Sequence, residues 1–223
     1  ASDVYKRQDM KYPATFLNTL IATVIGTLGI IVIASMGGYK MARVKTRYSR
    51  FCFLFCIAPM MIPFQSFMLT LVNVATTLHI NGKIWGLAII YWGLGAPMSI
   101  FLYQGFAKGI PLELEESALI DGCNQFQLFT RIIFPMLKSC TATVTIINVM
   151  WIWNDFLLPL LMLGGRKSSK TLQLAAYSFM GQYKMEWQNI MSAAILIIIP
   201  ALILYLIFQK SIIKGVVAGA VKG

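Results

Sequence analysis

The side chains that could do chemistry are few in this sequence, and half of the acidic ones lie in one short segment. Glu113, Glu115, Glu116 and Asp121 are four of the eight acidic residues, and all lie within residues 111–122. Long apolar runs flank this segment on both sides. Charge is costly inside a bilayer, so a charged stretch between such runs indicates a surface that a protein outside the membrane could hold.

Sequence patterns typical of enzymes are missing. The chain contains no G-x-x-x-x-G-K-[ST] loop for nucleotide phosphates and no H-E-x-x-H zinc motif. His79 is the single histidine, and we expect it to have an ordinary polar role in a short loop at the end of a span. We therefore predict no catalytic residue and no bound cofactor. A membrane-embedded transferase, which would need clustered acids or histidines, is the weaker alternative.

The cysteines do not form a recognisable site either. Their spacing fits neither a metal site nor a redox pair, so we expect no bound metal and no disulfide. The four are Cys52, Cys56, Cys123 and Cys140. Because the sequence has no phosphate loop, a transporter built from this chain would have to draw its energy from another polypeptide.

The elements that position these residues are predicted to be membrane helices. The chain is 58% hydrophobic and 12% charged, whereas soluble domains carry about 25% charged residues. The charges are clustered, and the apolar runs between them exceed the roughly 20 residues that a helix needs to cross a bilayer. We predict an all-α polytopic membrane protein with five spans, at about residues 16–39, 51–74, 84–103, 140–163 and 190–208.

Local features refine this prediction. Span one carries small residues that allow close helix contact in lipid, namely Gly26, Gly29, Ala34 and Ser35. Span two contains Pro59 and Pro63, which predict a kink that serves either a transport pathway or simple packing.

The basic residues indicate the orientation of the chain. Residues 40–50 contain five basic residues and no acid, which predicts a cytoplasmic loop. The net charge of +11 then reflects the ends of spans rather than nucleic-acid binding. Span one would enter from outside, so we expect either a further span or an exported N-terminus before it. Residues 1–8 fit neither a signal peptide nor a membrane flank; they resemble a translated adapter, and we expect native sequence from Asp9.

The acidic segment is predicted to be a short helix in the cytoplasm. Pro111 is suited to start it, the acids favour the positive end of its dipole, and Gly122 is suited to end it. Leu114, Ala118 and Leu119 share one side at helical spacing. A second short turn with Phe126 and Phe129 would follow, closed by Pro135. An ordinary amphipathic linker on the membrane surface remains an alternative.

Asp155 is the one formal charge inside any predicted span. Such a charge often marks a transport path, although its position toward the outer end favours a paired or hydrated side chain near the interface. Trp151, Asn154 and Asp155 are our candidates for lining a substrate path. The polar outer segment, residues 164–189, is predicted to reach a partner.

The acidic segment resembles the EAA loop of bacterial ABC-importer permeases. The family pattern is E-A-A-x3-G-x9-I-x-L-P, and this chain matches it at Glu116, Ala118, Gly122, Ile132 and Pro135. Two positions depart from the pattern, because Ser117 replaces alanine and Phe134 replaces leucine. The neighbouring Asp121 is similar to the carbohydrate-importer version.

Three further stretches resemble the maltose-type permease subunit. They are Trp153-Asn-Asp-Phe156, Gly181-Gln-Tyr183 and the closing residues 218–223. The resemblance covers residues 12–223. It implies a type I ABC importer transmembrane domain in residues 9–223, with a coupling segment at residues 108–138, in the inner membrane of a bacterium.

The resemblance also implies roles and partners. Glu116 would be the charged anchor of a coupling helix that sits in a cleft of an ATP-hydrolysing subunit. Ser117 and Ala118 would allow close approach, and Gly122 would form the turn; Asp121, Ile132 and Pro135 belong to the same coupling motif. ATP and magnesium would be held by the ATPase dimer, whose movements would rock the spans between inward-open and outward-open states.

Three other partners follow from the same resemblance. We expect a second, nonidentical permease subunit in the lipid bilayer. We also expect an extracytoplasmic sugar-binding protein that contacts Gly181, Gln182 and Tyr183, and contact between the tail and the ATPase dimer. The cargo would be a sugar or oligosaccharide; an importer of the same class for oligopeptides or polyamines is the alternative.

Overall fold

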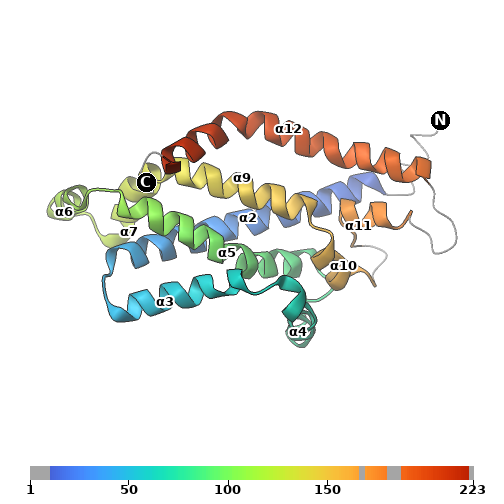
Figure 1. Ribbon diagram of the computed structural model, residues 1–223, viewed down its shortest axis with the longest axis horizontal. Helices are drawn as coiled ribbons and strands as arrows, with labels where there is room; N and C mark the ends of the chain where they lie inside the picture. Colours follow the sequence, from blue (N-terminus) through green and yellow to red (C-terminus); the bar gives the residue numbers. More distant parts are fainter. Residues whose placement is uncertain (1–10, 166–168, 180–186, 221–223) are drawn as a thin grey trace. The chain divides into compact units, whose positions relative to one another are not determined.

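The computed structural model describes residues 11–165, 169–179 and 187–220, and every regular element within these ranges is helical (Figure 1). The chain divides into two compact units. One comprises Ala1–Thr27, Phe64–Tyr91 and Asn148–Ile207, and the other comprises Leu28–Pro63, Trp92–Ile147 and Phe208–Gly223. We refer to them as unit 1 and unit 2 and describe each by itself.

Spans one and three are single helices, as predicted. They are α2 (Tyr12–Arg43) and α5 (Ile84–Lys108), and both are long and apolar enough to cross a membrane. The small residues of α2 do allow close approach. Within unit 2, a Cβ at Gly38 would lie 2.7 Å from Tyr103 Cβ, and a Cβ at Gly29 would overlap the indole ring of Trp92.

Span two is not the continuous helix that the sequence predicts. It consists of α3 (Arg47–Ile57), the 3₁₀ turn η1 (Ala58–Met61) and α4 (Phe64–Thr77). The break lies at Pro63, because proline lacks an N–H and forces the preceding residue out of the helical region. Ile62 accordingly has φ −98° and ψ 122°. The predicted kink is therefore a full interruption.

Span four is also interrupted. The helix α9 (Lys138–Asn154) stops before Asp155, and α10 (Leu157–Leu163) begins after Phe156. Asp155 Oδ1 accepts a hydrogen bond of 3.1 Å from the Leu157 N–H, which occupies one of the free N–H groups at the start of α10. The prediction of one helix over residues 140–163 is wrong because this short acidic side chain bonds the backbone locally and ends α9.

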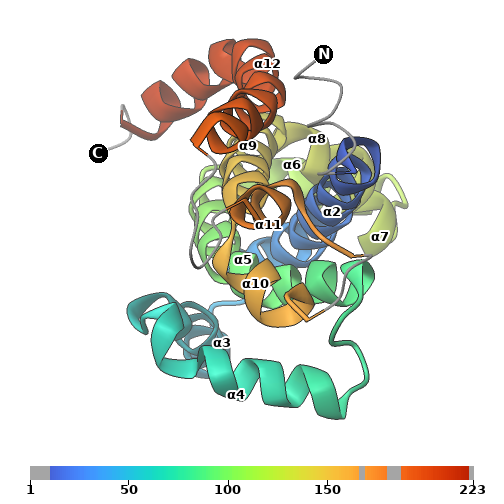
Figure 2. The same ribbon diagram turned by 90° about the vertical axis from the view of Figure 1, so that its right-hand side faces the viewer.

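Span five lies within α12 (Trp187–Ala220). The outer segment before it, predicted as a polar loop, contains the helix α11 (Leu172–Tyr177), which is largely buried. Figure 2 shows α11 beside α9, α2 and α12. Among the described residues, two of its side chains join a hydrophobic cluster of unit 1 made of Trp153, Leu172, Ala175, Ala193 and Ile197. This part of the segment is therefore core rather than a free loop.

By length and composition, two of the described helices could span a membrane, or up to four if each bent pair forms one span. The remaining predicted span corresponds to the shorter apolar stretch Ile190–Ile203 of α12. The predicted helical membrane architecture is thus recovered. Of the two bent pairs, one corresponds to predicted span two, whereas the other joins Gln125–Met136 to α9 and does not include α10.

Candidate functional site

The acidic segment folds as two short helical pieces joined by a turn. The first is α6 (Leu112–Ile120), which follows Pro111 and carries Glu113 and Glu115 in its first turn. Gly122 has a φ of +85°, a conformation that glycine adopts without the steric cost of a Cβ. The predicted start and stop of the helix are confirmed.

The second piece begins at a capping box. The side chain of Asn124 accepts a hydrogen bond of 2.8 Å from the Gln127 N–H, and the Gln127 side chain accepts one of 3.0 Å from the Asn124 N–H. The chain then continues through α7 (Gln125–Gln127), the π-helical segment η2 (Leu128–Ile133) and α8 (Phe134–Met136). The helix α6 packs against η2, so the two pieces form one compact unit.

A buried ion pair holds α6 to the end of α2. The side chain of Glu115 is almost completely buried, and its Oε1 accepts hydrogen bonds from Arg43, with the Nε donor at 2.6 Å. Its Oε2 accepts a hydrogen bond of 2.8 Å from the Tyr39 hydroxyl. Arg43 Nη2 also donates to the Ile110 carbonyl at 2.9 Å. We call Tyr39, Arg43 and Glu115 the clasp.

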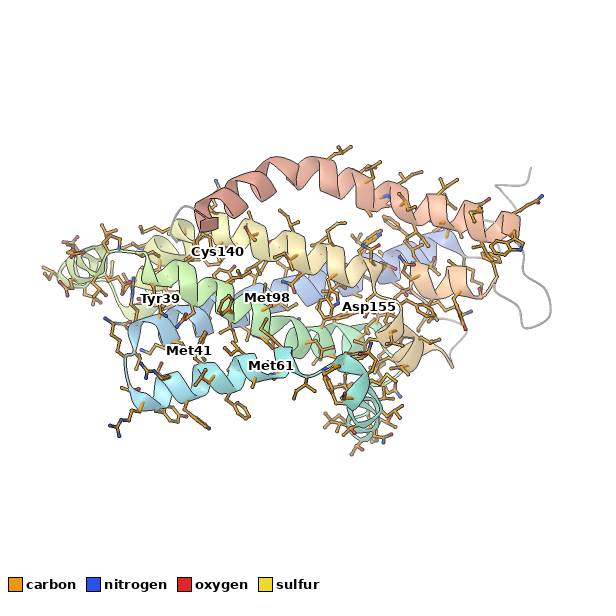
Figure 3. All side chains as sticks on the ribbon, viewed as in Figure 1. Tyr39, Met41, Met61, Met98, Cys140 and Asp155 are labelled. Atoms are coloured by element: carbon orange, nitrogen blue, oxygen red, sulfur yellow. The ribbon has the colours of Figure 1, made fainter. Side chains whose placement is uncertain are left out.

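Sequence position explains why the clasp can form. Tyr39 and Arg43 are four residues apart and thus lie on one face of α2; Figure 3 labels Tyr39 near the end of that helix. Arg43 is in the last turn of α2, where a cation is favoured by the helix dipole. A carboxylate can be buried only when it is paired and hydrogen-bonded, and Arg43 and Tyr39 together meet that requirement for Glu115.

The structure shows which side of α6 packs against the rest of unit 2. Leu114 and Leu119 are 44% and 42% exposed, whereas Glu115 and Ala118 are buried at 8% and 5%. The helix therefore packs through the face of Glu115 and Ala118. Ala118, for which the sequence predicts close approach to a partner, is buried within the chain in this structure. Sequence reasoning missed Glu115, and the Tyr39–Arg43 spacing is the signal that could have indicated a partner for it.

The remaining predicted coupling residues lie on the outer side of the segment. Glu116, Ser117, Asp121 and Gly122 are exposed, Ile132 is half-buried, and Pro135 is exposed. The Ser117 hydroxyl donates a hydrogen bond of 2.8 Å to the Glu113 carbonyl. Ile120, at 86% exposed, adds an apolar group to this free side, and the sequence analysis had not singled it out.

The structure separates the predicted path residues of unit 1. Asp155, labelled in Figure 3, is half-buried, and its Oδ2 accepts a hydrogen bond of 2.7 Å from the Tyr91 hydroxyl. Trp151 meets the ring of Tyr91 edge-on, with centroids 5.4 Å apart. Asp155 is thus hydrogen-bonded through both carboxylate oxygens, to Tyr91 and to the Leu157 N–H.

Asn154 instead faces a cavity. It lines a space of about 530 Å³ together with three polar or aromatic side chains that sequence reasoning missed, Phe156, Gln173 and Tyr177. Phe156 and Tyr177 have ring centroids 4.9 Å apart. Gly181, Gln182 and Tyr183, predicted to contact a binding protein, lie outside the described residues, as do the last three residues of the tail.

Comparison with known proteins places the chain among the membrane subunits of transport systems. Residues 25–217 match the family described as binding-protein-dependent transport system inner membrane component. The sequence is 40% identical over 207 residues to the probable starch degradation products transport system permease protein AmyC of Thermoanaerobacterium thermosulfurigenes, covering 93% of this chain and 75% of that protein. It is 39% identical over 210 residues to the multiple sugar-binding transport system permease protein MsmG of Streptococcus mutans, covering 93% and 76%.

Two further similarities agree. The melibiose/raffinose/stachyose import permease protein MelC of Bacillus subtilis is 34% identical over 210 residues, which cover 94% of this chain and 76% of that protein. A crystal structure of a bacterial ABC transporter involved in the import of the acidic polysaccharide alginate contains a chain with a TM-score of 0.74 at 22% identity, covering 88% of this chain and 74% of that one. The latter similarity concerns the fold alone; together with the family match over residues 25–217, it confirms the predicted transmembrane domain of an ABC importer.

Proposed function

Because the chain belongs to the family of binding-protein-dependent transport system inner membrane components, we propose that it is the permease subunit of an ATP-driven importer for sugars or oligosaccharides. A multi-pass location in the inner membrane follows from the family and from the apolar helices. The coupling part of the proposal rests on one observation. Glu116 is exposed on α6, while the clasp attaches the same helix to the end of α2.

The clasp supports a simple route for force. An ATPase partner that binds the exposed side of α6 moves the helix, and the paired charges of Glu115 and Arg43 carry that movement to the end of α2. Removing one partner of a buried ion pair costs about 3–5 kcal/mol because the other charge stays buried without compensation, so separation of α6 from α2 would be unfavourable. In this scheme the partner binds ATP and magnesium, and α6 of this chain transmits the movement to α2.

Relatives and cavity chemistry support a sugar as the cargo. The relatives are named for starch degradation products, multiple sugars, and melibiose, raffinose and stachyose. The cavity beside Asn154 combines amide and hydroxyl groups with aromatic rings, a mixture that suits a ligand with both hydroxyl groups and apolar C–H faces. Its described lining contains no carboxylate, which disfavours a polyamine. Oligopeptides remain the second candidate cargo.

The proposal includes three kinds of partner. A dimer of ATPase subunits would bind α6, with Glu116 as the charged anchor beside Ser117, Asp121 and Gly122. A second, nonidentical permease would complete the path, and a sugar-binding protein would approach the outer segment. The family description itself names dependence on a binding protein.

Substitution of Glu116 tests the coupling assignment. We expect Glu116→Lys to release the ATPase subunit during purification and to abolish uptake, because the substitution reverses the one charged anchor on the exposed face. Thr130→Lys is the control, since it adds a cation at another exposed position of the same segment. Copurification of the ATPase with the Glu116→Lys variant, together with normal uptake, would contradict the assignment of Glu116 as the anchor for the ATPase subunit.

The cargo is tested separately in proteoliposomes that contain the complete transporter and its binding protein. A panel of labelled oligosaccharides, tripeptides and spermidine is offered, and we expect ATP-dependent uptake of at least one oligosaccharide alone. Asn154→Leu and Tyr177→Phe should lower that uptake while ATPase copurification stays intact. Uptake of peptides or spermidine without any sugar would overturn the cargo class and leave the coupling assignment standing.

A further inference from the structure

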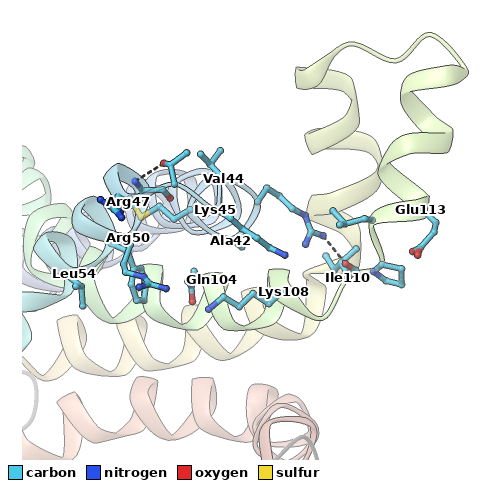
Figure 4. A pocket seen from close by; sticks show the side chains of 17 residues that line it. Ala42, Val44, Lys45, Arg47, Arg50, Leu54, Gln104, Lys108, Ile110 and Glu113 are labelled. Carbon is cyan, nitrogen blue, oxygen red and sulfur yellow. Dashed lines mark hydrogen bonds between the residues drawn. The ribbon is translucent and has the colours of Figure 1, made fainter.

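Unit 2 contains a cavity, separate from the exposed face of α6, whose lining has more basic than acidic residues. It encloses about 1090 Å³ where α2 ends, α3 begins and α5 ends (Figure 4). Its lining contains a single acidic residue, Glu113. Five basic side chains also line it, namely Arg43, Lys45, Arg47, Arg50 and Lys108.

Four of these five cations have no carboxylate partner. Within the described residues, the ion pair of Arg43 with Glu115 is the one that lies inside 4 Å. Lys45, Arg47, Arg50 and Lys108 are exposed. Figure 4 shows Gln104, a further possible donor, between Arg50 and Lys108. Within the part of the chain that the structure describes, the cavity is therefore a concentrated site with excess positive charge.

The position of two of these cations argues that they serve a ligand rather than the helix. Arg47 and Arg50 occupy the first turn of α3, which contains no acid. A cation there is unfavourable for the helix dipole by a few tenths of a kcal/mol or more. The N-terminal cap of α3 is made by Thr46, so neither arginine is needed to close the helix end. An anion between them would remove the conflict.

The rest of the lining is apolar. Met41, Phe53 and Leu54 border the same cavity, and Leu54 is 54% exposed. The exposed apolar surface continues along α3 through Phe51 and Phe55, at 63% and 70%. A soluble anion would gain nothing from such a surface, whereas a molecule with an anionic head and hydrocarbon chains would use both parts.

We propose that this cavity binds the headgroup of an anionic phospholipid of the cytoplasmic leaflet, with the acyl chains along α3. Basic pockets between membrane helices on the cytoplasmic side are suited to such headgroups, and each lysine or arginine near the surface contributes about 1 kcal/mol. The inference rests on the predicted cytoplasmic placement of residues 40–50. Because Arg43 belongs to both the cavity and the clasp, the bound lipid would lie against the base of the coupling helix and make coupling depend on membrane composition.

Lipid binding is measured on the complete transporter in nanodiscs of phosphatidylcholine, titrated with fluorescent phosphatidylglycerol. We expect saturable binding, weakened roughly thirtyfold in Arg47→Gln/Arg50→Gln, since about fivefold is lost per cation. Lys40→Gln/Lys138→Gln is the matched control. It removes the same charge from exposed positions outside the cavity lining, and we expect less than a twofold change.

Three outcomes would overturn the proposal. Equal weakening in both double variants would mean general attraction to a charged surface. Displacement of the lipid by millimolar inorganic phosphate would mean a small-anion site. Crosslinking of Arg50→Cys to the ATPase subunit, in place of a lipid-borne reactive group, would mean that an acidic protein segment covers the cavity. Each readout is independent of transport, so a failed coupling or cargo assignment would leave this test unaffected.

Discussion

Among the described residues, two carboxylates are at least partly buried, and they are held in different ways. Glu115 of unit 2 and Asp155 of unit 1 each accept a hydrogen bond from a tyrosine hydroxyl, at 2.8 Å and 2.7 Å. Glu115 has a cation as its second partner, Arg43. Asp155 has the Leu157 N–H instead, and no described cation lies within 4 Å of it.

The second partner decides what each carboxylate does. Arg43 and Glu115 are separated by 72 residues, so their ion pair joins two elements that are distant in the sequence. Asp155 and Leu157 are two residues apart, so their bond shapes the chain locally and ends α9. The first arrangement can transmit movement between elements, whereas the second defines a helix break. The predictions that follow test this distinction.

The largest effect is expected when the cation of the clasp is removed. Arg43→Met should destabilise the chain by about 3–5 kcal/mol, because it leaves Glu115 charged and buried without its partner. The midpoint of SDS-induced unfolding in mixed micelles measures the loss. Arg43→Met/Glu115→Met should recover most of the stability, since two apolar groups can replace a buried pair, but not the coupling of ATPase activity to uptake. Recovery of both would mean that the clasp has no part in coupling.

A smaller effect is expected when the two tyrosine hydroxyls are removed. Tyr91→Phe should cost about 1.5–3 kcal/mol, the range for a hydrogen bond to a charged group, because Asp155 then keeps only backbone partners. Tyr39→Phe should cost less, about 1 kcal/mol, since Arg43 continues to pair with Glu115. The same unfolding measurement compares the two variants. A larger loss in Tyr39→Phe would reverse the proposed difference between the sites.

The smallest effect is expected for neutralisation of Asp155. Asp155→Asn keeps one oxygen to accept from the Leu157 N–H, and its amide NH2 can donate to the Tyr91 hydroxyl, which then acts as acceptor. We therefore expect a loss below about 1 kcal/mol and near-normal uptake. Glu115→Gln is the matched variant, and it should lose more because Arg43 is left without a counter-charge. Abolished uptake in Asp155→Asn with intact assembly would show that the charge itself serves the path.

Much of the fold could be predicted from the sequence because it depends on local properties. Apolar length predicted the membrane helices, and the backbone requirement at Gly122 predicted the turn after α6. Interruption by Pro63 was predicted only as a kink, since proline alone does not say whether neighbouring groups will satisfy the freed backbone. The break at Asp155 was missed because a carboxylate within an apolar run carries no sign of which backbone N–H it will bond.

In the candidate site, too, local properties could be predicted from the sequence, whereas contacts between distant residues could not. The sequence by itself determined that residues 111–122 form a polar helix with a stop at Gly122, because charge, helix dipole and glycine conformation act over a few residues. It also identified the family through the spacing from Glu116 to Pro135. Only the tertiary structure decided which acid anchors the helix and which faces outward. That choice depends on where the end of α2 lies, since Glu115 could be buried only where Arg43 and Tyr39 were already placed to receive it.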